Sequence, residues 1–176
     1  MHSDMDSFML YNVENDNKEI IAKDLKYKTT DNENIFHESL WHLEFDGLVN
    51  RLGAGAGVWI HNMENNHVEG NDFRLNFKCT NNMANYEALI LGLQLVRKLG
   101  AKRVSIMEDS ELIIKQISGE YSMNNPRLSW YRDIILDLIK YLLESNSIAI
   151  PRKQNMQAHS LATFASTCKF PFQPNH

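Results

Sequence analysis

Two aspartates stand at similar places in the sequence, each close after a short, largely apolar stretch and directly before a small residue. Asp46 precedes Gly47 and Asp109 precedes Ser110. Carboxylate oxygens are the ligands that hard cations such as Mg²⁺ prefer in proteins. A plain structural role competes with metal binding, because aspartate suits turns and Asp109 directly precedes a predicted helix that it could cap. Both interpretations of Asp46 and Asp109 stay open from the residues alone.

The elements that must position these aspartates follow from the alternation of apolar and polar residues. They are predicted strands at 40–46, 58–60, 68–77, 103–107 and 147–151, and predicted helices at 81–98, 110–118, 128–143 and 154–167. Thr80 or Asn81 can cap the first helix, and Pro126 suits the first turn of the third. Three strands followed by alternating helices and strands predict an α/β protein, with a mixed five-stranded sheet flanked by helices.

Five glycine and alanine residues at 53–57 alternate just before the second predicted strand. Glycine spacing of this kind can form a phosphate-binding loop. Such a loop needs a following Lys-Ser/Thr pair and a helix, and neither is predicted here. The pattern therefore favours a bulged hairpin.

Five strings occur in one order along the chain. They are Phe-Asp-Gly at 45–47, Gly-Ala-Gly-Ala-Gly at 53–57, Thr-Asn-Asn-x-Ala-x-Tyr-Glu-Ala-Leu-Ile at 80–90, Asp-Ser-Glu-Leu-Ile-Ile-x-Gln-Ile-x-Gly-Glu-Tyr at 109–121 and Ile-Pro-Arg-x-x-Asn at 150–155. In this order and spacing they resemble the ribonuclease H domain carried by plant gypsy-type LTR retrotransposon polyproteins. The resemblance covers residues 40–165 and implies a ribonuclease H-like fold.

The resemblance implies a catalytic set of four carboxylates that hold two Mg²⁺ ions. Its positions correspond here to Asp46, Asn85, Asp109 and His159, so only two of the four are acidic. The expected site is therefore degenerate, with weak binding of Mg²⁺ or Mn²⁺ by Asp46 and Asp109. Ala149 is a third departure, because family members often carry a histidine there that helps product release. Asn85 as an ordinary first-turn residue and His159 as a solvent-facing helix residue are the competing structural interpretations.

Three nearby acids could replace the missing carboxylates, and the spacing argues against each. Glu44 shares a strand face with Asp46 but lies about 7 Å from it. Glu87 lies about 200° around the helix from Asn85, so it points away. Glu108 neighbours Asp109 and is expected on the opposite side of the strand.

The composition describes an ordinary soluble chain of 176 residues with net charge −4. An acidic balance disfavours a dedicated nucleic-acid-binding protein. The basic residues at 97–98 and 102–103 are interpreted as solvated surface, and Trp130 and Tyr131 as core packing. Two cysteines outside any metal spacing predict a reducing compartment, and no apolar run approaches the ~20 residues that cross a membrane. The cytoplasm or nucleus is therefore expected, without membrane association.

Three segments are expected. Residues 1–38 form a polar arm with a short apolar patch at 8–11, residues 39–167 the ribonuclease H-like domain, and residues 168–176 a tail. The chain begins with Met and shows no reverse transcriptase or integrase segment, which predicts a stand-alone product or an isolated fragment.

Three functions are open for such a domain. The leading expectation is a retroelement-derived, nuclease-deficient protein that binds a protein partner or, weakly, nucleic acid. The alternative is a weak metal-dependent ribonuclease acting on RNA in RNA/DNA hybrids. The third is an inactive relic. The fold alone does not decide among them.

Overall fold

The computed structural model describes residues 38–168, so most of the expected N-terminal arm and C-terminal tail lie outside the described residues. Its strands are β1 (Leu40–Asn50), β2 (Gly53–Asn62), β3 (Val68–Leu75), β4 (Arg103–Glu108) and β5 (Glu144–Ala149). They form one sheet in the order β3-β2-β1-β4-β5. β1 runs antiparallel to β2 and parallel to β4, so the predicted mixed five-stranded sheet is confirmed.

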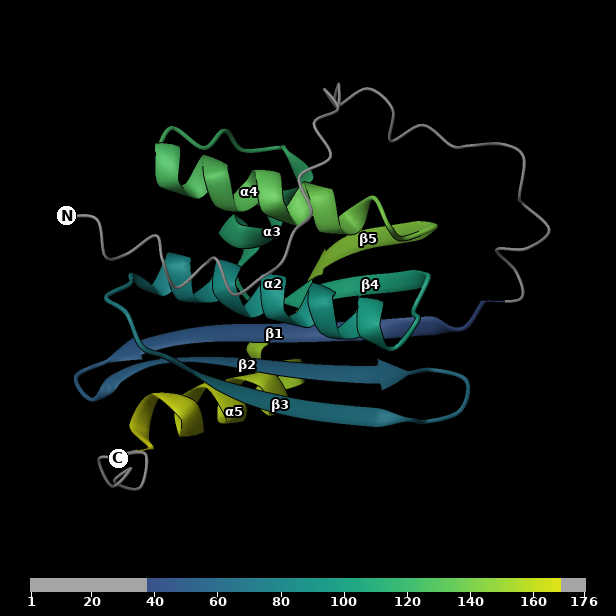
Figure 1. Ribbon diagram of the computed structural model, residues 1–176, viewed down its shortest axis with the longest axis horizontal. Helices are drawn as coiled ribbons and strands as arrows, with labels where there is room; N and C mark the ends of the chain where they lie inside the picture. Colours follow the sequence, from purple (N-terminus) through teal and green to yellow (C-terminus); the bar gives the residue numbers. More distant parts are fainter. Residues whose placement is uncertain (1–37, 169–176) are drawn as a thin grey trace, which may run out of the picture.

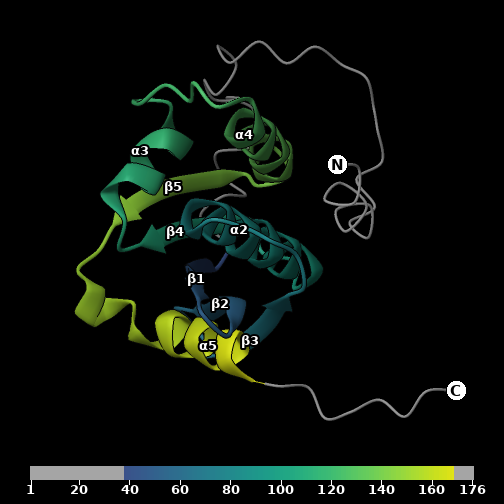
Figure 2. The ribbon, with the colours of Figure 1, turned by 90° about the vertical axis from the view of Figure 1, so that its left-hand side faces the viewer.

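The helices cover both faces of this sheet. They are α2 (Asn81–Lys98), α3 (Glu111–Ser118), α4 (Pro126–Ile139) and α5 (Met156–Thr167), with the short 3-10 turn η2 (Arg152–Gln154) before α5. Figures 1 and 2 show α2, α3 and α4 together on one side of the sheet and α5 alone on the other. Within residues 38–168, no helix has the length and apolar content needed to cross a membrane.

The predicted hairpin is present, because β1 and β2 pair antiparallel on either side of residues 51–52, but their register is continuous and shows no bulge. The second strand begins at Gly53, five residues before its predicted start. Residues 53–57 lie inside β2, where Gly57 pairs with Asp46 of β1. A Cβ added at Gly55 would overlap the carbonyl group of Ala162, and one at Gly57 would overlap that of Ala158. Alternate residues of a strand share one face. The glycines therefore let α5 pack directly on the backbone of β2.

The prediction for α4 is partly wrong. The helix begins at Pro126 and ends at Ile139, four residues before the expected end. Trp130 is 40% exposed, whereas Tyr131 is 1% exposed. The ring of Tyr131 stacks on that of Tyr86 with centroids 5.6 Å apart. Of the two aromatic residues assigned to the core, only Tyr131 lies there.

Two buried tyrosines connect the helices on the α2 side of the sheet. The hydroxyl of Tyr131 donates to Oε1 of Glu87 over 2.8 Å, and that of Tyr86 donates to Oε1 of Gln116 over 2.5 Å. Glu87 thus points into the α2–α4 interface, as its helical spacing predicts. Burial raises the pKa of Glu87 to about 7, although the hydrogen bond from Tyr131 partly opposes this shift.

Two asparagines of α2 bind amide groups of β1. The strand pairs with β4 only as far as Glu44, so later amides on that edge need other acceptors. The buried amide of Gly47 donates to Oδ1 of Asn85 over 2.6 Å. The exposed amide of Val49 donates to Oδ1 of Asn81 over 2.9 Å. A Cβ at Gly47 would overlap the backbone of Ala84, which explains why glycine stands at this contact.

These two contacts form a matched pair for mutation. We expect Asn85→Ala to lower the free energy of unfolding by about 1–3 kcal/mol, because it leaves the buried amide of Gly47 without an acceptor. Asn81→Ala should cost clearly less, because water can replace the lost acceptor at Val49. Urea denaturation of both variants measures the difference. Equal losses would show that the burial of the Gly47 amide contributes nothing.

Glu87 makes the stability of the fold depend on pH. Its folded-state pKa of about 7 lies above the ordinary value of 4.5, so the stability contributed by the protonated form is lost as pH rises through this interval. We expect wild type to lose on the order of 2–3 kcal/mol relative to Glu87→Gln over that range. Urea denaturation at several pH values tests this, with the exposed Glu120→Gln as a control for the removed charge. A difference that does not change with pH would contradict the buried-acid explanation.

Candidate functional site

Of the four positions named from the sequence, the other three lie around Asp46. The Asp46 side chain is on the face of β1 that α5 covers, and the residue is 5% exposed. His159 reaches it from α5, and Asn85 binds the neighbouring amide of Gly47 from α2. Asp109 follows β4 and is close enough to raise the pKa of Asp46. The elements therefore bring together the residues at the four positions that the family resemblance names.

His159 is bound to Asp46. Its Nδ1 lies 2.7 Å from Oδ2 of Asp46. A carboxylate can only accept a hydrogen bond, so the N–H of the imidazole donates. Burial raises the pKa of Asp46, the hydrogen bond with His159 lowers it, and the charge of Asp109 raises it. The alternative interpretation of His159 as a solvent-facing residue is wrong.

Asp109 does not cap a helix. The N-cap of α3 is Ser110, whose side chain accepts from the amide of Ile113. Oδ2 of Asp109 instead accepts a hydrogen bond from Nε of Arg152 over 3.2 Å. The Arg152 side chain is 67% exposed, so this ion pair contributes at most about 1 kcal/mol and can open readily. The sequence interpretation missed Arg152 as a partner, although the residue lies within the Ile-Pro-Arg string.

Asn85 connects α2 to β1 by a hydrogen bond. Its Oδ1 accepts from the amide of Gly47, and the residue is 8% exposed. At this position the family resemblance implies a glutamate that binds metal. In this chain the Oδ1 atom of Asn85 instead accepts a backbone hydrogen bond within the fold. The neutral amide is more than an ordinary first-turn residue, because it satisfies a buried backbone donor.

Glu108 is a third acid of the same cluster. It is 0% exposed, and it accepts a hydrogen bond from the amide of Ser110 over 2.5 Å. Burial raises its pKa, and the charges of Asp109 and Asp46 raise it further. Strand alternation turns its side chain away from that of Asp109, but both aspartates are still near enough to act on its pKa. A neutral, protonated Glu108 reduces the negative charge beside Asp46 and Asp109.

Glu44 does not join this cluster. Burial raises its pKa, and His61 on the neighbouring strand lowers it. Its electrostatic neighbour is therefore His61, across the β1–β2 pair, where Glu44 lies opposite Trp59. The prediction that Glu44 cannot replace a missing carboxylate agrees with this placement.

The residues at the site do not fit a two-magnesium centre. Such a centre needs several hard oxygen ligands that offset the charge of two divalent ions. Asp46 and Asp109 supply carboxylates, but these bind His159 and Arg152. Within the described part of the chain, no three or more His, Cys, Asp or Glu side chains form a group that could hold a metal ion. The contacts that the structure shows for these two aspartates are a hydrogen bond to His159 and an ion pair with Arg152.

Known sequences resemble this chain over the same region. Residues 44–165 match the family described as reverse transcriptase-like. Ribonuclease HI of Halobacterium salinarum is 32% identical over 125 residues, covering 70% of this chain and 63% of that protein. A bifunctional protein of Mycobacterium tuberculosis is 30% identical over 123 residues, covering 64% of this chain and 30% of that protein. The chain thus spans less than two thirds of the length of these relatives.

Solved structures resemble the fold over nearly their whole length. The ribonuclease H1 of Halobacterium salinarum has a TM-score of 0.68 at 27% identity, covering 72% of this chain and 96% of that chain. The N-terminal ribonuclease H domain of the Mycobacterium tuberculosis protein has a TM-score of 0.69 at 29% identity, covering 73% and 94%. LC11 ribonuclease H1 in complex with an RNA/DNA hybrid has a TM-score of 0.62 at 28% identity, covering 72% and 94%.

The matched region contains most of β1, every element from β2 to η2 and nearly all of α5, together with all four positions of the site. The predicted ribonuclease H-like fold is confirmed by these structures. Sequence and fold agree over more than half of the chain, and the chain therefore belongs to the reverse transcriptase-like family, with a domain of the ribonuclease H-like fold.

Proposed function

We propose that this chain is a nuclease-deficient ribonuclease H-like protein of plant gypsy-type retrotransposon descent, and that it acts by binding. The contact between His159 and Asp46 is the observation that carries the proposal. In a four-carboxylate site that contact would be replaced by repulsion between two acids, which a bound cation would have to offset. Here the imidazole of His159 donates a hydrogen bond to the Asp46 carboxylate, so no repulsion between two acids has to be offset by a cation.

The remaining positions support the same proposal. Arg152 pairs with Asp109, and Asn85 holds the amide of Gly47. Each of the four positions thus has a protein partner of complementary charge or hydrogen-bonding type. The five sequence strings support descent from the plant retrotransposon group, because they follow its order and spacing.

The proposed ligand is a protein partner, with weaker binding of nucleic acid. Residues 1–37 contain eight acidic and four basic side chains, so residues 38–176 contain fourteen of each. A domain without net positive charge gains little from phosphate contacts over its surface as a whole. Hybrid binding at physiological salt is therefore expected to be no tighter than micromolar.

The second candidate is a weak ribonuclease that requires a divalent metal and cleaves RNA in RNA/DNA hybrids. The proximity of the two aspartates favours it, since Asp109 is close enough to raise the pKa of Asp46. Ribonuclease HI of Halobacterium salinarum and LC11 ribonuclease H1 with its bound hybrid add to its support. Opening of the exposed Arg152 pair would free Asp109 for a metal.

Cleavage of a labelled RNA/DNA hybrid separates the two candidates. We expect absent or slight cleavage in millimolar Mg²⁺, because each ~1.4 kcal/mol of lost transition-state stabilisation lowers the rate tenfold and a missing carboxylate ligand costs several such steps. Asp109→Asn is the control for contaminating nuclease. Multiple-turnover cleavage that disappears in Asp109→Asn would establish the second candidate instead.

Restoring the acids tests the assignment of the site. We expect Asn85→Glu combined with His159→Asp to bind Mg²⁺ measurably by titration calorimetry, because four carboxylates would then surround the position beside Asp46. Gln94→Glu combined with Asn65→Asp adds the same two charges elsewhere and should bind none. If the restored variant keeps its fold and binds no more Mg²⁺ than this control, the assignment of Asn85 and His159 is wrong.

A further inference from the structure

A cavity of about 290 Å³ lies where the C-terminal ends of α2 and α4 meet, and we call it the α2–α4 pocket. Its lining is apolar at Leu93, Ala101, Leu138 and Leu142, and is completed by Arg97, Lys102 and Tyr141. Arg97 is twelve residues after Asn85 in α2, which places it about 18 Å along the helix from the candidate site. The pocket is therefore separate from the cluster around Asp46.

Two cations at this pocket have no acidic partner in the described chain. The guanidinium carbon of Arg97 lies 3.7 Å from the centre of the Tyr141 ring, an arrangement that holds the side chain in place. Among residues 38–168, neither Arg97 nor Lys102 forms an ion pair. Glu144 pairs with Arg103 over 2.8 Å, and Asp137 pairs with Lys140 over 2.9 Å.

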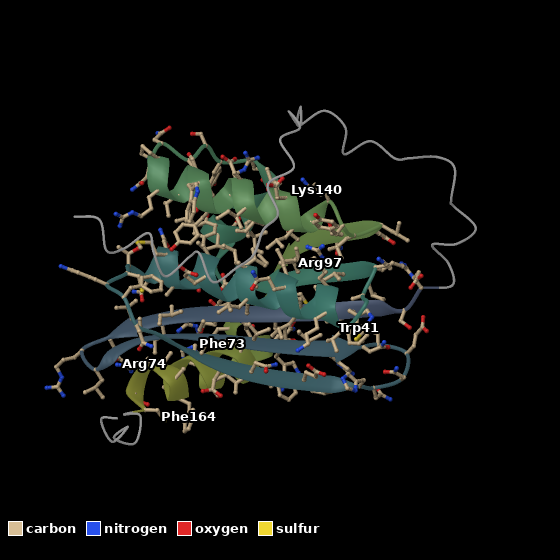
Figure 3. All side chains as sticks on the ribbon, in the orientation of Figure 1. Trp41, Phe73, Arg74, Arg97, Lys140 and Phe164 are labelled. Atoms are coloured by element: carbon tan, nitrogen blue, oxygen red, sulfur yellow. The ribbon has the colours of Figure 1, made fainter. Side chains whose placement is uncertain are left out.

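The position of the cations is only partly explained by the helix. Basic residues in the last turn of α2 interact favourably with the helix dipole, which accounts for Arg97 and Lys98. Lys102 lies beyond the helix, and the dipole does not explain the apolar lining beside it. Figure 3 shows Arg97 of α2 and Lys140, the residue after α4, on the same side of the sheet. The basic residues at 97–98 and 102–103 were expected to be ordinary solvated surface. That expectation does not explain why Arg97 and Lys102 stand beside an apolar pocket.

The chain itself contains a segment of matching chemistry. Residues 1–16 carry four acidic side chains and no Lys or Arg, and they surround the apolar residues Phe8, Met9, Leu10 and Tyr11. This short segment alone has the charge of −4 that the whole chain has, because the other residues balance. Its sequence offers carboxylates for two cations and a large apolar side chain for an aliphatic cavity.

The described domain begins beside the pocket. The carbonyl oxygen of Glu38 accepts a hydrogen bond from Nη1 of Arg103 over 3.1 Å, and Arg103 directly follows Lys102. Residues 17–37 could span up to about 70 Å if fully extended. Chain length therefore allows residues 1–16 to reach the pocket of their own domain.

We propose that residues 1–16 bind the α2–α4 pocket of the same chain. A side chain from residues 8–11 packs against Leu93, Leu138 and Leu142, and the acidic side chains pair with Arg97 and Lys102. A nucleic-acid strand fits less well, because aliphatic side chains offer its bases no stacking surface and Arg97 already lies over the Tyr141 ring. The proposal does not depend on whether the domain cleaves hybrids.

The test uses the full chain with ¹³C-methyl-labelled methionine. We expect the NMR signal of the Met9 methyl group to differ from that of a free synthetic peptide of residues 1–16. In Arg97→Glu combined with Lys102→Glu it should move to the free-peptide position. Arg51→Glu combined with Lys153→Glu changes the same residue types at exposed positions away from the pocket and should leave the signal as in wild type.

A charge exchange distinguishes a lost contact from a loss of folding in the pocket variant. Adding Asp4→Lys and Asp6→Lys to Arg97→Glu and Lys102→Glu should return the Met9 signal toward its wild-type position. The proposal fails if the wild-type signal equals that of the free peptide, or if both double variants shift it equally. It also fails if the shift depends on protein concentration, which indicates a second copy. Hybrid binding that is lost in the pocket variant while Met9 stays unchanged would make the pocket a nucleic-acid site instead.

Discussion

The close packing of α5 on β2 is the contact on which the arrangement around Asp46 depends. It requires the absence of side chains at Gly55 and Gly57, where a Cβ would overlap carbonyl groups of α5. Gly57 pairs with Asp46 in the neighbouring strand, so the same closeness sets how far His159 stands from the carboxylate. A helix held farther from the sheet by alanine side chains could not keep the 2.7 Å contact. The glycines of β2 thus determine the chemistry of a residue on β1.

Around Asp46 the chain balances a concentration of negative charge with its own groups. Burial raises the pKa values of Asp46 and Glu108, the charge of Asp109 raises both further, and the charge of Asp46 adds to the shift of Glu108. His159 and Arg152 each pair with one of the aspartates, and burial favours the neutral form of Glu108. Three acids so placed without partners would repel one another and destabilise the fold. The pairing offsets this repulsion within the protein itself.

The sequence predicted the order of strands and helices because the apolar periodicity and the turn residues were clear. It also pointed to the four positions that lie near one another, three of them within the five strings and His159 four residues after the last string. It did not predict the contacts of these residues. The glycine run was assigned to a bulge before the second strand and not to the strand itself, because glycine in a strand often marks a bulge and only the packing of α5 shows why it stands here. The hydrogen bond between His159 and Asp46 depends on how closely α5 approaches β2, which the periodicity of each element alone does not give.

The net charge of the whole chain differs from the net charge of its ribonuclease H-like domain. The value of −4 disfavours nucleic-acid binding when it is applied to the entire sequence. The acidic excess resides entirely in residues 1–37, and the remaining residues contain equal numbers of acidic and basic side chains. Within the domain, Arg97 and Lys102 border the apolar α2–α4 pocket. Glu38, two residues before β1, binds Arg103, which directly follows Lys102. Attraction between the two parts of the chain falls with ionic strength over a screening length of about 10 Å at 0.1 M salt. The partition of charge therefore bears on contacts within the chain as much as on any external ligand.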